Sequence, residues 1–282
     1  MPSNNALWRP LRQSLLRLYQ LVFVRPCWQP LNRLFYLLGL HGLGMLNYQD
    51  DRVSGERALL HRLLPRLREG ATVLDVGAHF GHYASAVKKL CPGAKVFAFE
   101  PNPTTFKRTE ENARQFGFTA VNKGCSDKPG RLQLYDQYNN TASAHASLFK
   151  EVFDDVHHFP CVAMDVEVVD LNSFAREQKL DRIDLLKIDA EGCEIPILKG
   201  ASELLAIERI DVIQFEFGEV NVISRAFFRD FVRTLPGFRF YRLLCGGLLP
   251  LDPYEPHFCE IFAHQNVIAF REKSGVLQSL GL

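Results

Sequence analysis

The stretch VLDVGAHFGHYA, residues 73–84, combines an acid, two glycines and two histidines after a short apolar run. Asp75, Gly77 and Gly81 would stand at the carboxyl end of a buried strand, where open parallel sheets bind their ligands. A glycine lets the turn approach a ligand closely, and a helix that begins beside it points free N–H groups at the same place. The spacing therefore indicates a cofactor-binding loop.

The acid in this loop separates two classes of cofactor. A dinucleotide-binding fold would carry GxGxxG at the turn, with the backbone packed on a pyrophosphate. Here the glycines are spaced GxxxG, and Asp75 stands two residues before the first of them. A carboxylate is a poor neighbour for a pyrophosphate and a good one for an ammonium group. The loop therefore favours a nucleoside that carries an amino acid, S-adenosylmethionine, over NAD.

Further candidate cofactor ligands follow the next two strands. FAFE ends in Glu100, whose carboxylate can accept hydrogen bonds from ribose hydroxyls in either class of cofactor. After the third strand, NKGCSD supplies Asn122, Ser126 and Asp127 as candidates for the adenine edge. A turn of Asn, Gly, Ser and Asp is also typical of any loop, so this pattern is the weaker of the two.

Candidate catalytic acids follow two later strands. In LLKIDAEGCE, Asp189 and Glu191 end one strand, and Glu216 ends the next in QFEFG. These three acids would line one rim, where a carboxylate could deprotonate a hydroxyl or bind a hard cation such as Mg²⁺. The spacing does not prove a metal. Lys187 lies on an otherwise apolar strand and needs a partner or a ligand, whereas Glu194 also suits a helix N-terminus.

The histidines are weaker candidates for chemistry. His79 lies in the cofactor turn and is expected to hydrogen-bond backbone or cofactor, and His82 is expected to be structural. His145 and the pair His157 and His158 could face the cleft, although a solvated loop is the simpler interpretation for the pair.

These residues need a frame of alternating strands and helices. Apolar runs alternate with amphipathic stretches from residue 54 onward, which favours a mainly parallel sheet with helices on both faces. Strands are expected at residues 71–77, 95–100, 118–124, 131–136, 161–170, 183–192, 210–218, 238–244 and 266–271.

The N-terminal part has a different composition. Residues 1–49 contain no Asp or Glu and carry five arginines among apolar and aromatic side chains. No run reaches the roughly 20 apolar residues of a membrane span, and no stretch suits a signal peptide. We expect a helical extension over residues 1–53 and one domain over 54–282. The extension either packs on the domain or on a partner subunit, or rests on an anionic membrane surface.

Composition excludes several classes of protein. The formal net charge of +1 gives no general field for nucleic acid, so no nucleic-acid partner is expected. The seven cysteines include no CxxC pair, which disfavours structural zinc and a disulfide scaffold and suits a reducing cytoplasm.

With its segments in this order, the sequence resembles the FkbM family of S-adenosylmethionine-dependent methyltransferases over roughly residues 54–272. The resemblance rests on VLDVGAHFGHYA, FAFEPNP, NKGCSDKPG, VEVVDLNSFA, LLKIDAEGCEIPILKGA, VIQFEFG, SRAFFRDF and NVIAF. It implies a Rossmann-like class I methyltransferase fold, with a seven-stranded, mainly parallel sheet whose last strand is antiparallel. It also implies the following roles: Asp75, Gly77 and Gly81 in the cofactor loop, Glu100 at the ribose, Asp127 near the adenine and Asp189 where methionine and acceptor meet.

The sequence therefore predicts an S-adenosylmethionine-dependent O-methyltransferase that acts on a hydroxyl of a saccharide or glycosylated natural product. Arg225, Tyr254 and Asn266 have suitable chemistry to bind such an acceptor. One alternative is a catalytically silent protein that keeps the cofactor fold and docks a partner or membrane through its N-terminal arm. A nucleotide-dependent oxidoreductase is a weaker alternative, because GxGxxG is missing.

Overall fold

The computed structural model describes residues 5–139, 142–143 and 146–281. The described chain forms two units, an N-terminal helical unit that ends at Leu43 and a sheet domain that begins at Gly44. This division falls before the boundary predicted at residue 53. The residues just after it belong to the sheet domain, because Met45 pairs with Gln265 and the Leu46 N–H donates to the carbonyl of His264 at 2.7 Å.

The N-terminal helical unit consists of two helices joined by a 3-10 turn. The helices are α1 (Asn5–Phe23) and α2 (Gln29–Gly42), and the turn is Pro26–Trp28. Asn32 fixes the junction: it accepts a hydrogen bond from the Tyr19 hydroxyl at 2.5 Å and donates to the carbonyl of Phe23 at 3.0 Å. Within the described residues, no helix has the length and apolar character that crossing a membrane requires.

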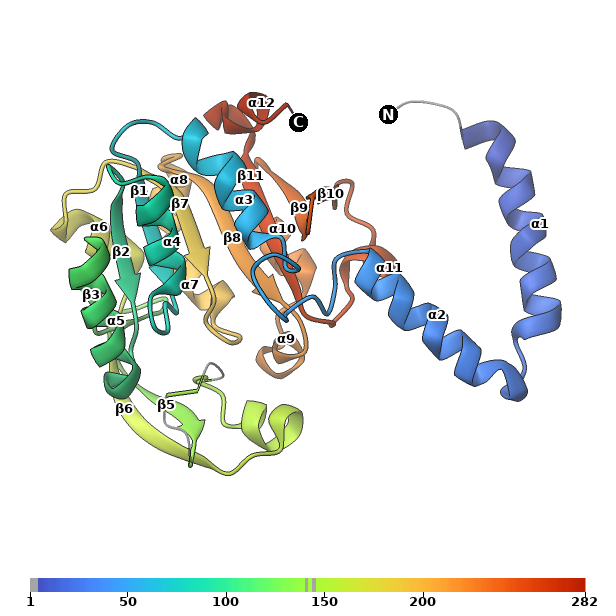
Figure 1. The fold of residues 1–282 in the computed structure, drawn as a ribbon, viewed down its shortest axis with the longest axis horizontal. Coiled ribbons are helices and arrows are strands. Elements are labelled where there is room, and N and C mark those ends of the chain that lie inside the picture. Colours follow the sequence, from blue (N-terminus) through green and yellow to red (C-terminus); the bar gives the residue numbers. More distant parts are fainter. Residues whose placement is uncertain (1–4, 140–141, 144–145, 282) are drawn as a thin grey trace. The chain divides into compact units, whose positions relative to one another are not determined.

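An eight-stranded sheet forms the centre of the sheet domain (Figure 1). Five neighbouring strands are parallel, while β11 runs antiparallel to β8 and β9, as expected for the last strand. The mainly parallel α/β prediction is confirmed, and the hairpin partner β10 adds an edge strand to the seven expected. In sheet order the strands are β3 (Thr119–Val121), β2 (Lys95–Phe99), β1 (Thr72–Val76), β7 (Ile183–Ile188), β8 (Ile210–Phe217), β11 (Gln265–Arg271), β9 (Phe238–Leu244) and β10 (Gly247–Pro250).

Helices cover both faces of this sheet, because its strands carry apolar side chains on both sides. Val73 and Leu185 face one core and Leu74 and Leu186 face the other. One face carries α3 (Glu56–Leu63), α4 (His82–Leu90), α5 (Pro103–Phe116) and α12 (Val276–Ser279). The other face carries α6 (Leu171–Glu177), α7 (Glu194–Gly200), α8 (Ser202–Ala206) and α10 (Phe228–Thr234). The shorter elements are α9 (Val220–Ser224), α11 (Pro256–Cys259) and two 3-10 turns, Leu64–Arg66 and Glu272–Ser274.

A second, three-stranded sheet stands apart from the first. It contains β4 (Gly124–Cys125), β6 (Cys161–Val169) and β5 (Gly130–Gln137) in that order. The strands expected at residues 131–136 and 161–170 are therefore present, and they pair with each other along their whole length. A π-helical turn, Val152–His157, lies in the connection between them.

Candidate cofactor and acceptor site

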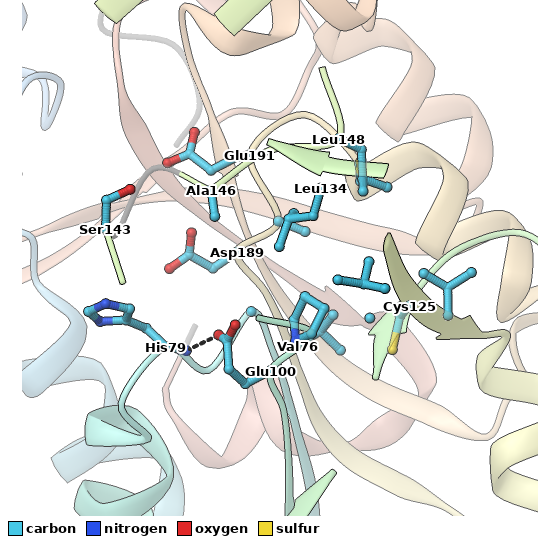
Figure 2. A pocket seen from close by; sticks show the side chains of 17 residues that line it. Val76, His79, Glu100, Cys125, Leu134, Ser143, Ala146, Leu148, Asp189 and Glu191 are labelled. Atoms are coloured by element: carbon cyan, nitrogen blue, oxygen red, sulfur yellow. Dashed lines mark hydrogen bonds between the residues drawn. The ribbon is translucent and has the colours of Figure 1, made fainter. Parts of the chain in front are cut away.

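A cavity of about 220 Å³ lies between the carboxyl ends of β1, β2 and β7 and the second sheet. Figure 2 shows carboxylate and imidazole groups gathered in one part of it and aliphatic side chains in another. The polar lining comes from His79, Glu100, Ser143, Asp189 and Glu191, and the apolar lining includes Cys125, Leu134, Leu148, Val166 and Val168.

The two glycines of the first loop are needed for packing within the protein. Gly77 has φ +79°, and a Cβ added there would stand 1.7 Å from the carbonyl oxygen of Asp189. Gly81 has φ +75° and precedes α4, and its added Cβ would stand 2.8 Å from the ring of Phe118. The loop can therefore close against the end of β7 only with glycine at the first position.

Asp75 lies behind the loop. Its side chain is fully buried and does not line the cavity. The ammonium nitrogen of Lys187 lies 4.0 Å from its Oδ1. Burial raises the pKa of Asp75 to about 6, although Lys187 acts in the opposite direction. The predicted ammonium-binding acid thus faces a lysine of the protein, and its loop faces the cavity.

Glu100 presents its carboxylate to the cavity from the end of β2. One oxygen accepts the N–H of His79 at 2.9 Å, and the other accepts the N–H of Asn102 at 2.8 Å. Burial raises the pKa of Glu100 to about 8. Because each carboxylate oxygen can accept a second hydrogen bond, the group retains capacity for hydroxyls in the cavity.

His79 is held by the protein. Its Nε2 lies 3.1 Å from the carbonyl of Ala142, its own carbonyl accepts the Thr109 hydroxyl, and its ring packs on Phe80 at 3.7 Å between centroids. Burial lowers the pKa of His79, which favours the neutral imidazole. His82 begins α4 and is exposed.

The three residues predicted at the adenine edge lie beside the cavity. The Asn122 amide donates to the backbone carbonyl of Glu100 at 2.8 Å, and the Ser126 hydroxyl donates to Asp127 at 3.3 Å. None of the three lines the cavity, whereas the neighbouring Cys125 does. The apolar lining from β5 and β6 was missed, although the alternation in RLQLYD indicates a strand with one apolar face to cover.

A second cavity, of about 810 Å³, lies beyond the ends of β7 and β8. Ile188 pairs with Phe215 across these parallel strands, so the next residues, Asp189 and Glu216, stand side by side as predicted. Asp189 and Glu191 line both cavities, which therefore meet at this rim. The lining includes Tyr48, His157, Asp189, Glu191, Glu194, Glu216, Glu219, Asn221 and His264.

The carboxyl group of Glu216 lies among other acids. Burial, followed by repulsion from Asp189, raises the pKa of Glu216 well above its ordinary value. His264 Nδ1 lies 3.6 Å from the Glu216 carboxylate, and the His264 ring meets Tyr48 edge-on. Tyr48 and His264 belong to loops distant in sequence, and nothing in their spacing indicated this contact.

Lys187 has the partner that its position requires. Its ammonium group lies 2.8 Å from Asp189 Oδ2 and 5.1 Å above the ring of Tyr83. Tyr83 donates to Gln214 at 2.9 Å, and Gln214 donates to Glu56 at 2.7 Å. This polar network holds Asp189, which lines both cavities.

The three predicted acceptor ligands are dispersed. Arg225 is exposed at the end of α9, the Tyr254 hydroxyl donates to Glu260 at 2.6 Å, and Asn266 is buried beside Gln214. None of the three lines the cavity at the acidic rim. His157 does, whereas His158 is exposed and His145 lies outside the described residues. Among the residues that the structure describes, no group of three or more His, Cys, Asp or Glu side chains is arranged to hold a metal ion.

Comparison with known proteins gives one family. The model of the methyltransferase FkbM domain matches residues 75–240, more than half of the chain. Methyltransferase sdnD of Sordaria araneosa is 30% identical over 158 residues, which cover 46% of this chain and 60% of that protein. Hexuronic acid methyltransferase AglP of Haloferax volcanii is 25% identical, with 59% and 64% covered, and 2-O-methyltransferase NoeI of Sinorhizobium fredii is 26% identical, with 57% and 70% covered. The match thus spans less than two thirds of the first two relatives.

Proposed function

Because the chain belongs to the FkbM methyltransferase domain family, we propose that it transfers a methyl group from S-adenosylmethionine to a hydroxyl of a saccharide or glycosylated natural product. The observation that carries this proposal is the pair of cavities that meet at Asp189 and Glu191. One cavity has the chemistry for a nucleoside and the other is a polar space for an acceptor. A two-substrate transfer needs such an arrangement, because it brings the reacting groups together.

The residues of the smaller cavity fit the cofactor. Glu100 would hold the ribose hydroxyls, since its carboxylate has unused acceptor capacity at the cavity wall. Leu134, Val166 and Val168 would cover the apolar faces of the adenine. When bound, S-adenosylmethionine supplies a methyl group on a sulfonium, which makes that carbon electrophilic.

The acids at the rim would orient the acceptor hydroxyl and take up its proton. The acceptor oxygen gains the methyl carbon as the carbon–sulfur bond breaks, and the hydroxyl proton must pass to a base. Lys187 contacts Asp189 at 2.8 Å and holds its carboxylate in place, so Asp189 would accept a hydrogen bond from the acceptor hydroxyl and orient it. Glu216, whose pKa burial raises, would accept the proton, and Glu191 completes the wall between the cavities.

Calorimetric titration with S-adenosylhomocysteine tests the cofactor half of this proposal. The full chain should bind it, and Glu100→Gln should weaken binding by roughly tenfold or more, because the amide puts an NH₂ donor in place of one of the two carboxyl oxygens. Glu177→Gln, an exposed acid at the end of α6, is the matched control and should bind like the wild type. A wild-type chain that binds neither S-adenosylhomocysteine nor S-adenosylmethionine would overturn the proposal.

We further propose that the N-terminal helical unit rests on an anionic membrane surface facing the cytoplasm. Helix α2 has 14 residues and thus a length of about 21 Å, too short for the roughly 30 Å hydrocarbon core. Arginines without any acid suit anionic headgroups, and a second copy of the unit would set arginine against arginine. The seven free cysteines suit a reducing compartment. Large exposed side chains on the unit include Leu11, Leu15, Leu18, Leu21, Trp28, Leu34, Phe35, Tyr36, Leu37 and Leu38.

Co-sedimentation with vesicles tests this placement. The full chain should bind vesicles of phosphatidylcholine with phosphatidylserine, and the double variant Arg12→Gln/Arg17→Gln should bind roughly thirtyfold less, at about 1 kcal/mol per arginine. The control Arg114→Gln/Arg131→Gln removes two exposed arginines of the sheet domain. Equal binding to neutral and anionic vesicles, or none, would contradict the placement.

A further inference from the structure

We propose that the acceptor is a saccharide that carries a phosphate group, and that this phosphate binds in a third cavity beside the acidic rim. The inference rests on the proposed function, because it extends the acceptor site. The third cavity, the basic cavity, has a volume of about 400 Å³. Its lining includes Gly192, Lys199, Arg225, Asp230 and Arg233.

Three helix ends bring positive charge into the basic cavity. Lys199 lies in the last turn of α7, Arg233 lies in the last turn of α10, and Arg225 directly follows α9. A helix C-terminus favours a cation, because its free carbonyl groups amount to roughly half a negative charge. Each side chain carries a full positive charge, so each helix end keeps an excess of positive charge. Because the three ends converge on one cavity, the excess is gathered there.

These cations are available to a ligand. Within the part of the chain that the structure describes, none of Lys199, Arg225 and Arg233 pairs with a carboxylate. Other exposed cations of the sheet domain do pair: Lys273 lies 2.7 Å from a carboxylate oxygen, and Arg239 lies 2.6 Å from another. The basic cavity thus differs from the rest of the described surface, where such charges are balanced by the protein.

Neither the local acid nor the overall charge accounts for this cluster. Asp230, the acid in the described lining, accepts the N–H of Phe227 at 2.9 Å at the start of α10. Residues 50–282 contain more acids than lysines and arginines, because five arginines precede them and the formal charge of the whole chain is only +1. Three cations without acidic partners in one cavity therefore indicate a site for an anion.

The basic cavity adjoins the larger cavity at the acidic rim, because Gly192 lines both. The elements between them separate the two kinds of side chain. Helix α7 presents Glu194 to the larger cavity and Lys199 to the basic cavity. Likewise, Glu219 before α9 lines the larger cavity, and Arg225 after α9 lines the basic cavity. One ligand can therefore place hydroxyls at the rim and an anionic group beyond Gly192.

A phosphate ester has the chemistry that the basic cavity requires. Its oxygens carry the negative charge and accept several hydrogen bonds at once. A guanidinium group binds phosphate through two parallel N–H···O bonds, and a lysine adds a point charge. The phosphate would anchor the saccharide and leave its hydroxyls free to reach Asp189. The phosphate itself takes no part in the transfer.

Binding of matched saccharides tests the inference without knowledge of the natural acceptor. The full chain, saturated with S-adenosylhomocysteine, is titrated calorimetrically with glucose 1-phosphate, methyl glucuronide and methyl glucoside. Glucose 1-phosphate should bind at least about tenfold more tightly than methyl glucoside, and methyl glucuronide should fall between them. The preference for the phosphate should shrink as ionic strength rises, because the three cations are exposed.

Two further ligands distinguish the sources of such a phosphate. UDP-glucose adds a nucleotide to the glucosyl phosphate, and farnesyl-phosphate-linked glucose adds an isoprenoid chain. Tighter binding of the first than of glucose 1-phosphate would identify a nucleotide-linked acceptor, and tighter binding of the second would identify a lipid-linked acceptor. Equal binding of all three would identify a simple sugar phosphate.

Variants link the preference to the basic cavity. Lys199→Gln/Arg233→Gln should lower the affinity for glucose 1-phosphate about tenfold or more, while the affinity for methyl glucoside stays within a few-fold. Arg225→Asn should act in the same direction, and asparagine tolerates the φ of +55° at this position. The control Arg114→Gln/Arg131→Gln removes two exposed arginines elsewhere and should leave the preference unchanged. Circular dichroism confirms that each variant is folded.

Three results would overturn the inference. Glucose 1-phosphate could bind no more tightly than methyl glucoside, or methyl glucuronide could bind as tightly as glucose 1-phosphate. The double variant could also keep the full preference, which would place the phosphate elsewhere. Failure of the proposed function is distinct, because the wild type would then bind no S-adenosylhomocysteine, whereas titration of the cofactor-free chain with glucose 1-phosphate would still report on the basic cavity.

Discussion

At the scale of single residues, the first glycine of the cofactor loop has the strictest requirement. Gly77 and Gly237 share nearly the same φ, +79° and +78°, yet an added Cβ meets the Asp189 backbone at 1.7 Å in the first case and open space in the second. The pair therefore separates the cost of an unusual backbone conformation from the cost of a steric clash.

Gly77→Ala should destabilise the sheet domain more than Gly237→Ala. The second variant should lose about 1 kcal/mol of unfolding free energy, for an alanine in the left-handed region. The first should lose a further 1–3 kcal/mol or so, because the end of β7 must move, and it should bind S-adenosylhomocysteine more weakly. Urea denaturation followed by circular dichroism measures both changes. Equal losses would show that the β1 and β7 ends do not press on each other.

Sequence alone predicted some positions at this scale and missed others. Asp189 and Glu216 could be placed together, because both follow neighbouring parallel strands. The direction of the Asp75 side chain could not, because it depends on the buried Lys187. The contact of Glu216 with His264 joins a strand end and a loop that lie far apart in the chain, and no spacing in the sequence indicates it.

At the scale of elements, the second sheet completes the smaller cavity. Asp136 on β5 is fully buried, accepts the side-chain amide of Asn102 at 2.8 Å and accepts the Ser143 hydroxyl. Asn102 in turn donates its N–H to Glu100 and caps α5. These hydrogen bonds link β5, in the second sheet, to Glu100, the residue that we propose binds the ribose.

Asp136→Ala should therefore weaken the binding of S-adenosylhomocysteine by about tenfold and lower the unfolding free energy by 1–3 kcal/mol or so, as for a lost buried hydrogen-bond acceptor. Asp165→Ala is the matched control, since Asp165 lies exposed on β6 of the same sheet and should change neither quantity. Calorimetry gives the affinities. If both variants bind with the wild-type affinity, the second sheet does not position Glu100.

The sequence predicts that β5 and β6 are strands, but it does not predict which sheet they join. Alternating residues in RLQLYD and the apolar run before residue 170 identify strands, but neither says which sheet they join. The expected alternation of strands and helices suited the central sheet, where it was correct. The two strands pair with each other, and the connection between them buries apolar residues such as Phe153.

At the scale of the whole molecule, several buried acids give the sheet domain a common pH dependence. Burial raises the pKa of Glu100 to about 8, of Glu194 to about 7 and of Asp75 to about 6, and it raises that of Glu216 well above its ordinary value. Each acid holds its proton more firmly in the folded state than in the unfolded state. Unfolding free energy therefore falls as pH rises between the unfolded and folded pKa values.

The domain should accordingly be most stable near pH 5 and lose a few kcal/mol, in order of magnitude, by pH 8. The pKa of His79 is lowered, so this one group makes the unfolding free energy rise with pH at the acidic end of the range. Glu100→Gln should flatten part of the decline between pH 5 and 8, because its amide does not titrate. Urea denaturation across this range measures the slope. A wild-type stability that rises with pH to 8 would contradict the account.

Transfer of a deuterated methyl group from S-adenosylmethionine to glycosides, detected by mass spectrometry, tests the central claim most directly. We predict a methoxy product on at least one hydroxylated glycoside and at least a hundredfold lower kcat for Glu216→Gln, with little change in affinity for S-adenosylhomocysteine. Cofactor binding without transfer to any glycoside, or a Glu216→Gln variant with wild-type kcat, would contradict it.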